Sequence, residues 1–124
     1  MGGDGVTWLG VLSLDDLHDV LFFLEAPMPE RLPAVYIVSN KRQGTLYIGV
    51  TSNLVQRVWQ HKTHAAKGFT DRYNLNKLMY YELHQTMADA IAREKQLKSG
   101  SRLKKVQLIE SQNPAWQDLY ADLL

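Results

Sequence analysis

Two short runs of β-branched and aromatic residues, at positions 35–38 and 45–50, predict two β-strands. Turn-forming residues separate the two runs, which is typical of a β-hairpin. A third run, at 78–83, predicts a third strand. A four-residue hairpin loop would place Tyr36 and Tyr47 on the same face of the sheet, and a five-residue loop would place them on opposite faces, because side chains alternate along a strand. The pattern alone leaves both registers open.

Apolar residues recur at helical spacing in other segments, and residues that cap helices stand before them. Ser13 and Thr86 each open a sequence similar to a capping box, and Asn53 offers another N-cap. The polar stretch at 67–76 predicts a loop. The predicted helices cover residues 14–25, 54 to about 66, a segment that opens at Thr86 and closes at Gly100, a segment around 103–109 that ends before Asn113 and Pro114, and a short final stretch at 115–124.

The strands are few and lie near one another in the chain, so the order of elements favours an α+β fold over a doubly wound parallel sheet. Prolines between positions 27 and 33 predict a linker. We therefore expect two parts, an N-terminal leader at 1–33 that carries one amphipathic helix and a folded domain at 34–124.

The composition narrows the class of protein. A chain of 124 residues suits one domain with a short appendage. It has no cysteine, which excludes disulfides, zinc knuckles and thiol nucleophiles and is compatible with the cytoplasm. No apolar run approaches the roughly 18 residues that span a bilayer, so we expect no membrane association.

The formal net charge of +1 hides an uneven distribution. Residues 1–33 carry six acids and one base, a net charge of −5, whereas residues 34–124 carry 13 bases and seven acids, a net charge of +6. An acidic leader on a basic body is compatible with a nucleic-acid partner for the body. One hypothesis is that the leader masks the basic surface in the absence of substrate.

Arg57 and His61 are candidates for chemistry. They stand four positions apart on a predicted helix, so their side chains project from one face. Arginine offers a planar fork suited to phosphate, and histidine can accept a proton near neutral pH. A solvated helix face explains the same pair, and Gln56, Gln60 and Lys62 support that alternative.

Glu94 stands on the apolar side of its predicted helix, where carboxylates are rare unless they are paired or bind metal. One carboxylate together with a substrate phosphate is a usual way to hold Mg²⁺. The alternative is a surface ion pair with Lys98, four residues later. A basic cluster here suits a polyanion-binding surface, although a solvated lysine-rich face is the common explanation; it comprises Lys95, Lys98, Arg102, Lys104 and Lys105.

Taken in chain order, these fragments resemble the GIY-YIG nuclease superfamily, in particular its small stand-alone bacterial members. The resemblance covers about residues 34–120. Its first motif departs from the family pattern, with Ala34 and Val35 where the family has Gly and Ile, and Val50 follows the second motif where some members carry Lys. The fragments that carry it are Ala34 to Tyr36, Tyr47 to Gly49, Asn53 to Arg57 with His61, Ala90 to Lys98, and Asn113 to Trp116.

The resemblance implies a three-stranded antiparallel sheet flanked by helices and a phosphodiesterase that uses one divalent metal ion. By position, it implies that Tyr36 and Tyr47 line the site on one face of the sheet and that Arg57 stabilises charge on the scissile phosphate. Glu94 would hold Mg²⁺, for which Mn²⁺ can substitute. The group that takes the proton from water would be His61 or Tyr47. The residues expected to bind substrate are Gly49, Lys95, Lys98, Arg102 and Asn113.

The sequence thus predicts an endonuclease that cuts DNA, leaves 5′-phosphate and 3′-hydroxyl ends, and acts in DNA repair or recombination in the cytoplasm. Duplex, branched and single-stranded DNA, and RNA, all stay open as substrates. Two alternatives differ in class. One is a non-catalytic nucleic-acid-binding module on the same fold, and the other is a protein-interaction domain that docks through the helix at 14–25.

Overall fold

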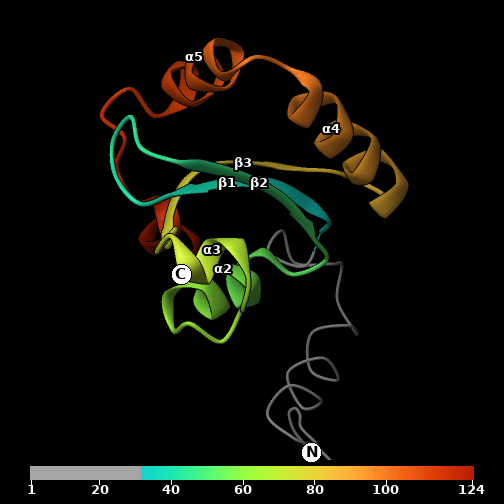
Figure 1. The fold of residues 1–124 in the computed structure, drawn as a ribbon. Helices are drawn as coiled ribbons and strands as arrows, with labels where there is room; N and C mark the ends of the chain where they lie inside the picture. The colour runs from blue at the N-terminus through green and yellow to red at the C-terminus, as the bar shows by residue number, and fades with distance from the viewer. Residues whose placement is uncertain (1–31) are drawn as a thin grey trace, which may run out of the picture.

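The computed structural model describes residues 32–124 (Figure 1). The helix predicted at 14–25 lies outside these residues, so the two-part division at residue 33 stays a prediction. Among the described residues, no helix is long and apolar enough to cross a membrane. The described elements are β1 (Ala34–Ser39), β2 (Leu46–Thr51), α2 (Leu54–Lys62), α3 (Phe69–Arg72), β3 (Lys77–Leu83), α4 (Met87–Ser99), α5 (Arg102–Gln112) and the 3₁₀-helix η2 (Leu119–Leu123).

The three strands form one antiparallel sheet in the order β2-β1-β3, which confirms the α+β fold. Tyr36 pairs with Gly49 and Val38 pairs with Tyr47 across β1 and β2. Tyr36 and Tyr47 therefore lie on the same face, because residues two apart on a strand share a face. The connecting loop runs from residue 40 to 45 and is longer than the predicted four or five residues. Its even length gives the same side-chain parity as a four-residue loop.

Helices cover both faces of the sheet (Figure 1). On one face, Tyr36 and Val38 of β1 pack with Leu54 and Val58 of α2, and η2 joins this layer. On the opposite face, α4 and α5 pack on the alternate residues of the strands. The second layer buries Val35, Ile37, Ile48, Met79, Tyr80, Ala90, Ile109 and Trp116. Alternate side chains of β1 thus pack into the hydrophobic cores on the two faces of the sheet, and each of these side chains is buried.

Two helix starts follow the predicted caps, whereas some helix ends differ from the prediction. Asn53 and Thr86 each accept a backbone N–H in the first turn of α2 and α4. Ser101, which was not predicted as a cap, does the same for α5. The predicted extension of α2 to about residue 66 is wrong, because the helix ends at Lys62 and His64 adopts a left-handed φ of 62°. A left-handed residue cannot continue a right-handed helix.

Two further predictions of secondary structure need correction. The stretch predicted as a loop at 67–76 contains the one-turn helix α3. The final stretch at 115–124 forms the 3₁₀-helix η2 rather than an α-helix that starts at 115. Asp118 begins this turn, because its carboxylate accepts the backbone N–H groups of Tyr120 and of Leu78 on β3. The C-terminal segment is therefore fixed to the sheet by one side chain.

The helix α4 is fixed to β3 by a charged cluster. The Arg93 guanidinium donates from Nε and Nη2 to the Glu82 carboxylate at 3.0–3.1 Å. Tyr80 donates to the same carboxylate at 2.5 Å, and His84 lies 2.9 Å from it. These contacts lower the pKa of Glu82 despite the opposing effect of burial. The cluster sets the position of α4, which also carries Glu94.

Candidate active site

Tyr36 lies at the centre of the candidate site, on the middle strand of the sheet. Its side chain is 1% exposed. The ring lies directly over Gly49 of β2, where a Cβ atom would come within 2.5 Å of the Tyr36 Cζ and Oη atoms. Gly49 therefore leaves the space that the Tyr36 ring occupies. The group that approaches Gly49 is therefore a tyrosine of the same sheet, and contact of Gly49 with substrate stays a prediction.

The helix α2 brings Arg57 and His61 to the Tyr36 hydroxyl. The Tyr36 Oη atom lies 2.9 Å from His61 Nε2 and accepts the Arg57 Nε–H at 3.4 Å. Arg57 Nη1 also donates to Gln60 at 3.0 Å. The pair predicted from its four-residue spacing thus converges on one atom, and the alternative of a freely solvated helix face does not hold for His61, which is 3% exposed.

Burial keeps His61 neutral. Removal from water, and secondly the charge of Arg57, lower the pKa of His61 to about 4. Its Nδ1 atom lies 3.0 Å from Thr70 Oγ1, on α3. A neutral histidine has one donor and one acceptor nitrogen. If Nε2 accepts the proton of the Tyr36 hydroxyl, then Nδ1 carries the hydrogen and donates it to Thr70. His61 is thus arranged to receive a proton through Tyr36.

The Tyr36 hydroxyl is protonated in this arrangement. Burial raises the pKa of Tyr36, and the charge on Glu94 adds to the increase, whereas the hydrogen bond and charge of Arg57 oppose it. Arg57 therefore stabilises the tyrosinate that would form if the proton moved to His61. His61 can thus accept the proton of the Tyr36 hydroxyl, and Arg57 can stabilise the negative charge that this leaves on the buried Tyr36 oxygen.

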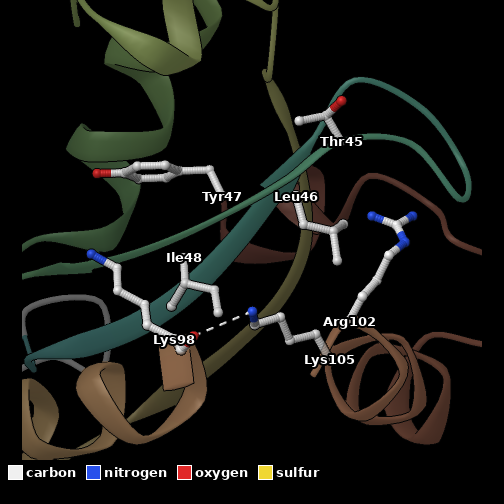
Figure 2. Close-up of a pocket in the computed structure, with 7 residues that line it drawn as sticks. All are labelled: Thr45, Leu46, Tyr47, Ile48, Lys98, Arg102 and Lys105. Atoms are coloured by element: carbon white, nitrogen blue, oxygen red, sulfur yellow. Dashed lines mark hydrogen bonds between the residues drawn. The ribbon is translucent and has the colours of Figure 1, made fainter. Parts of the chain in front are cut away.

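Tyr47 is the more exposed of the two tyrosines. Its ring lies 6.3 Å from the His61 ring in an edge-on arrangement and stacks on Phe69 with ring centres 6.2 Å apart. The Lys98 ammonium lies 5.8 Å from the centre of the Tyr47 ring, as Figure 2 shows. Tyr47 thus separates the buried Tyr36 group from the basic side chains of α4.

Glu94 lies on α4 and is bonded to Lys98. Its side chain is 14% exposed, and Lys98 Nζ lies 2.9 Å from Glu94 Oε2. The predicted ion pair with Lys98 is therefore present, and the charge on Glu94 also contributes to the raised pKa of Tyr36. Metal binding by Glu94 stays a prediction.

The donor set fits a lightly held Mg²⁺ ion. Within the part of the chain that the structure describes, no group of three or more His, Asp or Glu side chains could hold a metal ion. Magnesium commonly keeps several waters and binds through one carboxylate and the phosphates of a substrate. Glu94, partly exposed beside a lysine that a phosphate would attract, has this character.

Part of the predicted basic cluster lines a hollow of about 400 Å³ beside β2, together with Thr45, Leu46, Tyr47 and Ile48. Lys98, Arg102 and Lys105 reach into it from α4 and α5 (Figure 2). Arg102 is also structural, because its Nη2 donates to the carbonyls of Gln43 and Gly44. Lys95 is exposed and does not line this hollow.

Asn113 has a structural role at the end of α5. Its Nδ2 donates to the carbonyls of Met79 and Gln117, and its Oδ1 accepts the Gln117 N–H at 3.0 Å. The side chain is buried and its polar atoms bind backbone, so the structure does not join it to the Tyr36 group. Contact of Asn113 with substrate stays a prediction.

Sequence patterns missed three neighbours of the site. Thr70 and Phe69 belong to the stretch predicted as a loop, and Gln60 was assigned only to a solvated face. The spacing of His61 and Thr70 follows no helical or strand period, so no pattern indicates their contact. The aromatic character of Phe69 within a polar stretch is the signal that could have found α3.

The family model described as "GIY-YIG catalytic domain" matches residues 32–107. The chain therefore belongs to the GIY-YIG family, a class of nuclease-type domains.

Relatives of this chain carry the name UPF0213. UPF0213 protein SSP2268 of Staphylococcus saprophyticus is 33% identical over 75 residues, which are 60% of this chain and 90% of that protein. UPF0213 protein CPE1444 of Clostridium perfringens is 34% identical over 79 residues, 64% of this chain and 84% of that protein. The solution NMR structure of UPF0213 protein BH0048 from Bacillus halodurans is similar with a TM-score of 0.45 and 23% identity, over 69% of this chain and 90% of that one.

Proposed function

We propose that this chain is a metal-dependent endonuclease that hydrolyses phosphodiester bonds in DNA and leaves 5′-phosphate and 3′-hydroxyl ends. The observation that carries the proposal is the convergence of His61 and Arg57 on the Tyr36 hydroxyl. Membership of a nuclease-type family supports the reaction class. A role in DNA repair or recombination in the cytoplasm is part of the proposal.

The protein residues would move one proton and balance one charge. Both ring nitrogens of His61 are hydrogen-bonded, so we infer that His61 reaches the attacking water only through Tyr36. The water gives its proton to Tyr36 Oη while the Tyr36 proton passes to His61 Nε2. The water oxygen bonds to phosphorus, the bond from phosphorus to the 3′ oxygen breaks, and the leaving 3′ oxygen takes a proton from solvent water to give the 3′-hydroxyl. Of the two bases that the sequence left open, this geometry favours His61 over Tyr47.

Arg57 and Glu94 would act on the phosphate. The Arg57 guanidinium is half-buried and stabilises negative charge on the phosphoryl oxygens as it develops. Glu94 would hold Mg²⁺, which supplies polarisation of the phosphate and stabilisation of the leaving oxygen when bound. The arriving phosphate would draw Lys98 away from Glu94 and so release this carboxylate.

The test is cleavage of labelled duplex, flap, junction and single-stranded DNA with Mg²⁺, Mn²⁺ or a chelator. We expect wild type to cut at least one substrate only with metal, and Glu94→Gln and Arg57→Ala each to lower the rate by about 10²-fold or more. Asp89→Asn is the matched control, because it removes an exposed acid from the same helix. Wild type that cuts none of the DNA substrates with either ion would refute the proposal.

The Lys98–Glu94 ion pair favours a second candidate, a non-catalytic nucleic-acid-binding module. If that pair is permanent, Glu94 is structural and cannot hold a metal ion. This candidate predicts DNA binding that weakens with salt, because neutralised phosphates release counterions, and no cleavage with either ion. The same panel of substrates therefore distinguishes the two candidates.

A further inference from the structure

A line of aromatic rings leads from the candidate active site to the surface. The Tyr47 ring lies 6.3 Å from His61 at its inner end and stacks on Phe69 at 6.2 Å, with planes 28° apart. Phe69 in turn packs on Tyr73, with ring centres 4.7 Å apart. The last two rings belong to α3 and the residue that follows it, so the one-turn helix extends the line away from the sheet.

The outer two rings are exposed although they are large and apolar. Phe69 is 45% exposed and Tyr73 is 48% exposed. Their helix is fixed from beneath, because Thr70 between them is buried against His61. The segment thus holds two exposed rings at a defined distance from the active site. Adjacent exposed aromatic side chains on a fixed support mark an interaction site.

Basic side chains accompany this line of rings. Lys98 lies over the Tyr47 ring, and Lys105 and Arg102 line the hollow beside it (Figure 2). On α3, Arg72 is exposed and lies between Phe69 and Tyr73 in the sequence. The nearby acid Asp71 is already paired, with His64 at 2.9 Å and Lys67 at 3.8 Å. The surface therefore combines stacking faces with positive charge, a combination that fits an unpaired, negatively charged strand of bases.

We propose that Phe69 and Tyr73 bind unpaired bases beside the scissile phosphate, so that the substrate of this enzyme is DNA with a single-stranded segment. The inference rests on the proposed function, since it names the substrate of the same site. Base faces are free to stack only in an unpaired strand, whereas a continuous duplex hides them. Lys98 and Lys105 contact the phosphates that connect the stacked bases.

The experiment measures binding without catalysis. The full chain is titrated against a fluorescent single-stranded oligonucleotide and against a blunt duplex of the same sequence, in chelator and at one salt concentration, and anisotropy gives Kd. We expect wild type to bind the single strand more tightly than the duplex. Phe69→Ala and Tyr73→Ala should each weaken single-strand binding about tenfold and change duplex binding by less than about twofold.

Two further variants test the ring itself. Phe69→Leu keeps an apolar side chain but lacks an aromatic face, and should weaken single-strand binding as Phe69→Ala does. Tyr73→Phe keeps the face and should bind as wild type does. The control is Trp59→Ala, because Trp59 is 52% exposed on α2 and has no ring contact with the other described aromatics. Its Kd should be unchanged. Thermal unfolding of each variant confirms that it is folded.

The outcomes separate this inference from the proposed function. Equal Kd values for Phe69→Ala and wild type on the single strand, or equal weakening on single strand and duplex, overturn the stacking site even if wild type cuts DNA. A selective loss with Phe69→Ala supports the stacking site even if no substrate is cut. Wild type that binds the duplex but does not bind the single strand also overturns the inference.

Discussion

At the scale of single residues, the candidate site depends on the absence of a side chain at Gly49, because Tyr36 occupies that space. Gly49→Ala would put Cβ 2.5 Å from the Cζ and Oη atoms of Tyr36. Because Tyr36 is packed between β2 and α2, the ring has to shift and its hydroxyl leaves His61 and Arg57. We expect a loss of about 1–3 kcal/mol of unfolding free energy and a large loss of cleavage. Urea unfolding and the single-turnover cleavage rate measure the two effects.

Gly100→Ala is the control for this prediction. Gly100 has an ordinary φ of −80°, and the nearest atom to an added Cβ is the Leu97 carbonyl oxygen at 3.4 Å. Its substitution should leave activity intact and change stability by about 0.5 kcal/mol or less. Wild-type cleavage by Gly49→Ala would show that the Tyr36 ring does not need its present position.

His61 makes stability depend on pH. The folded pKa of His61, about 4, is below its ordinary value of 6.5. Between these values the unfolded chain binds the proton more strongly, so stability decreases as the pH falls from 6.5 to 4. The full loss, about 3 kcal/mol, is reached below pH 4. His61→Gln removes the titrating ring, so urea unfolding at pH 7 and pH 4.5 should show a smaller pH difference for this variant. Equal differences would contradict the burial of a neutral imidazole.

At the scale of elements, the sequence predicted what is determined locally. The predicted N-caps Asn53 and Thr86 stand next to the turns they start, and the strand β1 is a continuous apolar run because both of its faces are covered. The Arg57–His61 pair was also local, because helical spacing alone puts both on one face. Chain-local information was therefore sufficient for three strands and for the starts of two helices.

Contacts that follow no helical or strand period explain what the sequence patterns could not predict. The α3 turn exists where Thr70 meets His61 and where the Leu75 N–H binds the Thr70 carbonyl at 2.8 Å, and neither contact follows from a period. The shared face of Tyr36 and Tyr47 depended on whether the hairpin loop had an even length, which turn-forming residues do not specify. The position of Thr70 and the shared face of the two tyrosines were therefore decided by contacts that the residue pattern does not specify.

The helix α4 shows how two adjacent side chains serve different elements. Arg93 points to Glu82 on β3, and Glu94 forms an ion pair with Lys98 on the same helix. Neighbouring positions on a helix differ by about 100° in direction, so Arg93 can attach α4 to the sheet while Glu94 points elsewhere.

At the scale of the whole molecule, the charge is divided between two regions. Residues 32–124, which the structure describes, carry the net charge of +6, and the net charge of −5 belongs to residues 1–31. The hollow lined by Lys98, Arg102 and Lys105 lies in the basic region, where a polyanion would bind. An acidic segment tethered to this domain would compete with DNA for the same cations.

Removal of residues 1–31 should therefore tighten DNA binding. The deletion keeps Pro33, whose carbonyl accepts the His84 N–H at 2.8 Å and so belongs to the folded domain. We expect a Kd about tenfold lower at low salt and a smaller change at high salt, because salt screens both the competing acids and the DNA phosphates. Changing the six acids of this segment to their amides in the full chain should reproduce the effect if charge causes it. A Kd that stays constant in both variants would exclude masking, and a change in the deletion alone would attribute the effect to bulk rather than charge.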